Sequence, residues 1–224
     1  MQGRLSESET GALQEFPRRE WEAEFARAAA AGFDSIQWLY DVYGEDVNPI
    51  ATDDGVARIR ALSREHGIAV DSLCAHYLIE RPEDVERLDW LVERCRATGI
   101  ARVVLPFLEG AKFDPRLVAS LARPGVELLV EGVPDAAAFN YDTGYDPLGA
   151  IGPNVRGVHV KDRDAAGKNV PLGEGIVDFD SVFHELGRIG YDGDFVLETP
   201  RPQRGSEVVW GRGQINLVSR ILRG

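Results

Sequence analysis

The feature that most constrains the fold is a regular alternation of short apolar segments with longer amphipathic ones. Amphipathic stretches recur along the chain and commonly end at a glycine, such as Gly32, Gly67 or Gly99. Short apolar segments, typical of buried strands, lie at residues 33–39, 68–73, 102–107, 126–130, 138–141, 155–160 and 195–197. Strands that alternate with helices predict a parallel sheet.

The amphipathic stretches carry apolar residues at helical spacing. Val56, Ile59 and Leu62 share one face ahead of Gly67, and Pro17 is suited to the first turn of a helix that ends at Gly32. We expect helices over residues 17–31, 56–66, 82–98, 115–121, 180–186 and 214–222.

The number of repeats favours an α/β protein with a (β/α)8 TIM barrel, formed by residues 1–224 as one domain. We expect residues 1–5, MQGRL, to be the end of a first strand, with either a trimmed first element or a late start codon as the reason for its shortness. Residues 131–142 are too few for a full helical crossover, so we expect the fifth helix to be reduced or missing. No GxGxxG follows the first strand, which disfavours a dinucleotide-binding sheet.

Composition excludes several classes of protein. The net charge of −12 and the pI of about 4.8 argue against a nucleic acid partner, because phosphate backbones require clustered Lys and Arg. No apolar run approaches the length of a membrane span. The start of the chain does not read as a secretory signal, and Cys74 and Cys95 lack a CxxC spacing, so we expect a cytoplasmic protein.

Four residues that can bind metal lie at four successive predicted strands, three of them just after a strand and His159 within residues 155–160. They are Glu131, Asp142, His159 and Glu198. In a parallel barrel the carboxyl ends of the strands form one mouth, where these side chains are expected to meet. Three carboxylates and one imidazole suit a divalent ion, with manganese the first expectation and magnesium, cobalt or zinc the alternatives. Each residue also has an ordinary interpretation as a turn, surface or core residue.

Motifs along nearly the whole chain resemble one superfamily. They are MQGRL, GFDSIQWLYD, VVLPFLEGA, LLVE, NYDTG, HVKDRD, VPLGEGIVDFD and GYDGDFVLET. With them the chain resembles the xylose-isomerase-like TIM barrels, a superfamily that includes sugar phosphate isomerases and epimerases, ketose 3-epimerases and endonuclease IV. The resemblance implies that Glu131, Asp142, His159 and Glu198 are the metal ligands.

The implied reaction is proton transfer next to the carbonyl of a sugar or sugar phosphate, through an enediolate. The resemblance suggests Glu131 and Glu198 as the catalytic pair, and it leaves epimerisation and isomerisation equally open. Residues expected near the mouth could contact substrate hydroxyls or a phosphate: Gln2, Arg4, Trp38, His76, Glu109, Lys161 and Arg163. Lys161 and Arg163 are the preferred phosphate ligands, although they could instead pair with Asp162 and Asp164.

Departures from the family pattern keep a second class open. Gln37 stands where many relatives have Glu, Tyr145 follows DTG where relatives have His or Asn, and the connection before Asp142 is short. A sugar-binding or inactive barrel is therefore the alternative, and a homo-oligomer could cover the exposed sheet. An abasic-site endonuclease is disfavoured because the chain has 4 histidines and an acidic charge.

Overall fold

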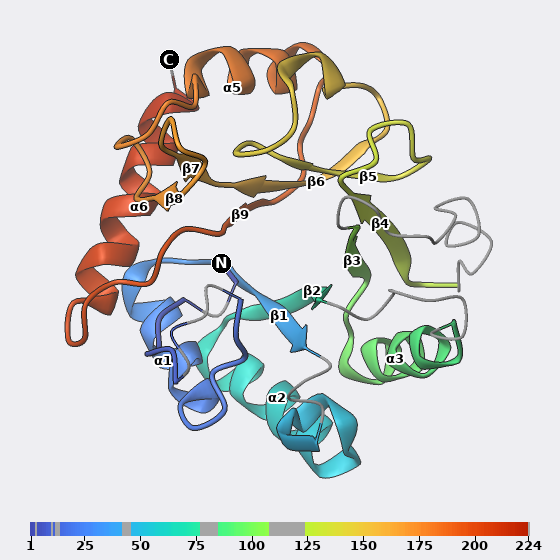
Figure 1. Ribbon diagram of the computed structural model, residues 1–224. Coiled ribbons are helices and arrows are strands. Elements are labelled where there is room, and N and C mark those ends of the chain that lie inside the picture. Colours follow the sequence, from blue (N-terminus) through green and yellow to red (C-terminus); the bar gives the residue numbers. More distant parts are fainter. Residues whose placement is uncertain are drawn as a thin grey trace.

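The computed structural model describes residues 1–2, 4–9, 11, 14–41, 46–76, 85–107 and 124–223. In the described part, seven parallel strands follow one another around a nearly closed barrel (Figure 1). In order they are β1 (Ser35–Asp41), β2 (Ala69–His76), β3 (Arg102–Pro106), β4 (Glu127–Glu131), β5 (Phe139–Asp142), β6 (Val155–Val160) and β9 (Phe195–Leu197). The predicted shortened (β/α)8 barrel is confirmed.

The first two residues lie between the two ends of this sheet (Figure 1). The backbone N–H of Gln2 donates to the carbonyl of Leu197 on β9 (3.3 Å), and the N–H of Gln37 on β1 donates to the carbonyl of Met1 (2.7 Å). Met1 and Gln2, in the segment where the truncated first strand was expected, thus bridge β9 and β1 by backbone hydrogen bonds.

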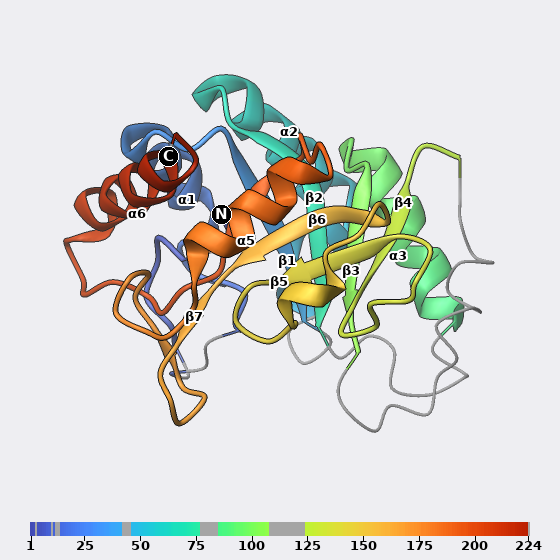
Figure 2. The ribbon, with the colours of Figure 1, turned by 90° about the horizontal axis from the view of Figure 1, so that it is seen from above.

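Helices cover the outside of the barrel on either side of the β4–β5 region. The long ones are α1 (Trp21–Ala31), α2 (Asp53–His66), α3 (Val85–Thr98), α5 (Phe179–Arg188) and α6 (Glu207–Ile221). Two single 3-10 turns, η2 (Pro49–Ala51) and η4 (Leu148–Ala150), accompany them. In Figure 2, α6 lies beside α1, and Arg212 of α6 donates to the carbonyl of Ala30 (2.7 Å). No helix in the described ranges is both long and apolar enough to cross a bilayer.

Two helix starts differ from the sequence prediction by four residues or more. Residues 18–20 form a turn after Pro17, so α1 begins only at Trp21. The last helix begins at Glu207, seven residues earlier than predicted, because Gly211 lies against Ala31 and Phe33, where its lack of a side chain permits close helix contact. The helix predicted at residues 115–121 lies outside the described residues.

The connection between β4 and β5 carries no helix. Residues 132–138, all of them described, form bends and a turn. Asn154 braces this connection by donating to the carbonyls of Pro134 (2.7 Å) and Ala136 (2.8 Å). The fifth helix is missing, as the short spacing between Glu131 and Asp142 predicts.

Asp162 organises the long loop that follows β6. It lies in β7 (Asp162–Arg163), which pairs with β8 (Asn169–Val170) in an unpredicted antiparallel hairpin. Its buried carboxylate accepts backbone N–H groups from Arg163, Gly173, Gly175 and Val177, at 2.9 to 3.2 Å. Gly175 is required there because a side chain would meet Asp162 and the Arg163 carbonyl at 2.1 and 2.4 Å.

We expect Asp162→Ala to lower the free energy of unfolding by about 3 kcal/mol, because several buried N–H groups lose their hydrogen-bond acceptor. This value is the upper end of the range for the loss of a hydrogen bond to a charged group. Asp164→Ala is the matched control in the same hairpin, because the Asp164 carboxylate accepts the backbone N–H groups of Ala166 and Lys168 in an exposed turn. Urea unfolding of both variants measures the difference. Equal losses would contradict the role given to Asp162.

Candidate metal centre

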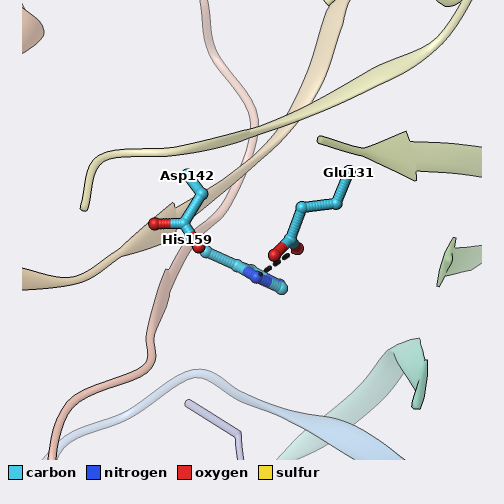
Figure 3. A group of neighbouring side chains, drawn as sticks. All are labelled: Glu131, Asp142 and His159. Carbon is cyan, nitrogen blue, oxygen red and sulfur yellow. Dashed lines mark ion pairs between the residues drawn. The ribbon is translucent and has the colours of Figure 1, made fainter. Parts of the chain in front are cut away.

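Three of the four predicted ligands form one compact cluster at the carboxyl ends of the strands. One ligand atom from each of Glu131, Asp142 and His159 lies within 4.8 Å of the others. Figure 3 shows the Glu131 carboxylate against the His159 ring, with the Asp142 carboxylate beside them. His159 and Asp142 are almost fully buried, at 0% and 1% exposure.

Strand register brings these side chains together. Asp142 is aligned with His159 across β5 and β6, and Glu131 is aligned with Asn140 across β4 and β5. Side chains alternate between the two faces of a strand, so Asn140 and Asp142 share the inner face of β5. By the same alternation, His159 and Lys161 lie on one face of the chain at the end of β6. Asn140 Nδ2 in turn donates to Glu131 Oε2 at 3.0 Å and holds that carboxylate in place.

The fourth predicted ligand, Glu198, lies on the other side of His159. Nδ1 of His159 is 2.9 Å from Glu131 Oε2 and 2.8 Å from Glu198 Oε2. Burial alone would lower the pKa of His159, but the two carboxylates outweigh it and raise that pKa to about 10. Burial opposes ionisation of Glu131 and Glu198, yet His159 and Lys161 hold the pKa of both carboxyls below the usual value.

Lys161 reaches into the same cluster. Its Nζ lies 2.5 Å from Asp142 Oδ2, 3.0 Å from Glu198 Oε1 and 3.9 Å from Glu131 Oε1. Although burial disfavours the ammonium, these three carboxylates raise the pKa of Lys161. For Asp142 burial dominates, and its pKa rises to about 7 despite the lysine. The alternative that Lys161 pairs with Asp162 is wrong, since the Asp162 carboxylate accepts backbone N–H groups instead.

The donor set fits a divalent cation. Asp142 Oδ2, His159 Nδ1 and Glu198 Oε2 are buried atoms that lack an aligned hydrogen-bond partner and face only charged neighbours. Buried carboxylates need a counter-cation, because an unpaired buried charge is strongly unfavourable. Carboxylate oxygens with one imidazole nitrogen are a common ligand set for manganese, magnesium and zinc.

The other sequence candidates lie at varied distances from the cluster. Arg4 is fully buried, with Nη2 at 3.5 Å from Glu198 Oε1. His76 ends β2, beside Cys74 (Sγ to Nε2, 3.3 Å), and burial lowers its pKa to about 4. Arg163 stacks on the ring of the half-exposed Tyr145, with its guanidinium carbon 5.5 Å from the centroid.

One further candidate, Trp38, is not brought to the cluster. Trp38 follows Gln37 directly, so it points to the opposite face of β1, where it packs against Phe16, Trp21 and Phe25 at 2% exposure. Its Nε1 donates to Asn48 Oδ1 (2.9 Å). Glu109 lies outside the described residues.

Comparison with known proteins agrees with this architecture. Residues 131–217 match the family model of the xylose isomerase-like TIM barrel, and this segment contains all four predicted ligands. The structure of L-ribulose 3-epimerase superposes with a TM-score of 0.73 over 100% of this chain and 93% of that one, at 17% identity. The chain therefore shares the fold of this TIM-barrel structure.

A second solved structure and a sequence relative agree with this comparison. The structure of the IolI protein with a bound zinc atom superposes on this chain with a TM-score of 0.71 at 14% identity. The superposition covers 99% of this chain and 96% of the IolI chain. L-ribulose-5-phosphate 3-epimerase UlaE of Escherichia coli (strain K12 / DH10B) is 37% identical over 171 residues, 67% of this chain. This chain covers 60% of the length of that protein. In a second alignment it covers only 25% of the length of UlaE from Salmonella paratyphi C.

Sequence reasoning missed two residues that touch the predicted ligands. Asn140 holds Glu131, and period-two alternation within NYDTG could have identified it, since it shares a face with Asp142. Gln37, noted only as the loss of a charge, places Oε1 2.9 Å from His159 Nε2. No local pattern predicts that contact, because the two residues are 122 positions apart.

Proposed function

We propose that this protein is a metal-dependent isomerase or epimerase of a sugar or sugar phosphate. The observation that carries the proposal is the pair of carboxylates, Glu131 and Glu198, each within 2.9 Å of His159 Nδ1 at the mouth of the barrel. Relatives and structural neighbours named as ketose epimerases support the same reaction class. A divalent ion held by Glu131, Asp142, His159 and Glu198 would polarise the substrate carbonyl and stabilise an enediolate.

The two glutamates supply the proton chemistry. Both have a lowered pKa, so each is a carboxylate that can accept a proton. One carboxylate takes the carbon-bound proton next to the carbonyl and becomes a carboxylic acid. The other, once it has taken a proton from solvent, gives that proton to the enediolate and returns to a carboxylate, and the first then releases its proton to solvent. Return to the opposite face of the same carbon inverts it, whereas return to the neighbouring carbon interconverts aldose and ketose.

Arginine, lysine and histidine side chains around the cluster are proposed to bind the substrate. Arg4 and Lys161 lie against Glu198, and His76 lies near the same end of the barrel. Arg163 pairs with no carboxylate of the described ranges and is only partly buried, so its guanidinium is the better placed of the two predicted phosphate ligands. Lys161 is already surrounded by carboxylates and is better suited to a substrate oxygen beside the metal.

Solvent exchange tests the proposed reaction. Protein loaded with Mn²⁺ is incubated in deuterated water with a panel of ketoses and ketose phosphates, ribulose 5-phosphate among them. We expect one deuterium to enter a carbon next to the carbonyl, because a carboxylate that removes a proton exchanges it with solvent. Mass spectrometry and NMR locate the label and separate inversion from carbonyl transfer.

Saturable binding of a sugar without exchange would instead support a binding protein. The contacts of Lys161 give that alternative a structural reason, because an ammonium already satisfies the carboxylates that would hold the ion. Metal analysis decides between the two, since a binder of this kind would retain no stoichiometric Mn²⁺.

A further inference from the structure

A chain of buried polar side chains runs from the start of the protein to His159. Arg4, Gln2, Gln37 and His159 are at most 2% exposed. They come from the segment that bridges β9 and β1, from β1 itself and from β6. Polar groups are costly to bury without hydrogen bonds, so the order of donors and acceptors along this chain is physically constrained.

Arginine sets the direction of the chain because a guanidinium can only donate. Arg4 Nη2 donates to Gln2 Oε1 (3.2 Å), which turns the amide nitrogen of Gln2 toward Gln37. Gln2 Nε2 then donates to Gln37 Oε1 (2.9 Å). The oxygen of Gln37, and not its nitrogen, therefore faces the interior.

The same oxygen lies 2.9 Å from His159 Nε2. Since Gln37 Oε1 can only accept, His159 Nε2 must carry the hydrogen of this bond. In a neutral imidazole the lone pair then belongs to Nδ1, the atom that faces Glu131 and Glu198. A histidine ligand commonly donates its other N–H to an acceptor that fixes both the tautomer and the orientation of the ring.

We infer that Gln37, oriented by Gln2 and Arg4, is a positioning residue that keeps the hydrogen of His159 on Nε2 and commits Nδ1 to the metal. This inference rests on the proposed metal centre. It gives the neutral Gln37 a function, since an amide oxygen provides the acceptor without placing a further negative charge among the three carboxylates. It also gives the two-residue N-terminal bridge a part in the site.

The wild-type protein provides the first test. Zinc is diamagnetic, so long-range proton–nitrogen NMR of the zinc-loaded, ¹⁵N-labelled protein reports the state of each ring nitrogen. We expect Nδ1 of His159 to be metal-bound and Nε2 to carry a slowly exchanging proton. The chain has 4 histidines, and His66→Gln and His184→Gln help to assign them, because both residues lie in helices away from the cluster.

Two variants of Gln37 provide the second test. Gln37→Met keeps the length of the side chain but removes the acceptor, so we expect zinc affinity to fall about 10- to 100-fold and the Hε2 signal to be lost. Gln37→Glu keeps an acceptor oxygen and is expected to retain the Hε2 signal and most of the affinity. Calorimetric titration with zinc measures affinity, and a cooperative thermal transition establishes that each variant is folded.

The outcomes separate this inference from the proposed function. Zinc bound through Nε2 in the wild type, or an unchanged affinity and Hε2 signal in folded Gln37→Met, overturns the inference and leaves the proposed metal centre intact. A wild-type protein that binds no zinc overturns both. If Gln37→Met does not fold, the wild-type spectrum and Gln2→Met, which removes the donor that orients Gln37, decide the question.

Discussion

In the Glu198→Gln variant, we expect divalent metal binding to be severely weakened and solvent exchange into the substrate to be lost. Glu198 is 1% exposed and meets His159, Lys161 and Arg4 with its two oxygens. The change removes a charged ligand and one of the two proposed proton carriers. Loss of proton transfer alone is worth about 10²–10⁴-fold in rate. Elemental analysis of the dialysed protein and deuterium uptake measure the two effects.

Glu174→Gln is the matched control for this variant, because it removes the same charge from an exposed position in the loop after β8. It should leave metal content and exchange unchanged. His159→Ala separates the two roles of Glu198, since it removes a ligand but leaves both carboxylates in place. Retention of metal and exchange by Glu198→Gln and His159→Ala alike would refute the assigned centre.

In the Lys161→Met variant, we expect the metal-free protein to lose about 3–5 kcal/mol of unfolding free energy, the cost of leaving buried charges without their partner. Lys161 is 5% exposed, and its ammonium lies within 4 Å of carboxylate oxygens of Asp142, Glu198 and Glu131. Methionine replaces the aliphatic part of the side chain, so the loss reports mainly the charge.

Divalent ions are expected to restore much of the lost stability, because an ion that binds only the folded state stabilises it by mass action. The variant should also bind Mn²⁺ more tightly than the wild type, since no ammonium competes for the carboxylates. Urea unfolding in chelator and in excess Mn²⁺ measures both effects. Lys168→Met, in the exposed turn of the β7–β8 hairpin, is the control. Equal stability of Lys161→Met and wild type in chelator would contradict this account.

These two predictions concern one balance of charge. Within one cluster, three carboxylates, of which Asp142 and Glu198 are buried, face His159 and Lys161, and Arg4 lies against Glu198. We propose that the lysine satisfies these carboxylates when no ion is bound, and that it would become available to a substrate oxygen if an ion took over that role. The reaction and the stability of the barrel are therefore expected to depend on the same side chains.

Local sequence patterns predicted the scaffold well. The predicted stripe of Val56, Ile59 and Leu62 is buried in α2. The absence of a helix before Asp142 followed from the small number of residues between the two strands. Helix starts were less predictable, because the early start of α6 depends on contact between Gly211 and residues near position 31. The side chain of Trp38 was placed wrongly at the mouth of the barrel. Its position near a strand end was identified, but the sequence prediction did not decide whether it lies on the inner or the outer face of that strand.

What the sequence by itself determined was the order of strands and helices and the set of chemical groups at the strand ends, because periodicity and glycine boundaries act over a few residues. Only the tertiary structure decided how these groups meet. Gln37 reaches His159, and Arg4 reaches Glu198, across 122 and 194 positions of the chain. Such contacts depend on strand register and on closure of the barrel by Met1 and Gln2, which no local pattern encodes.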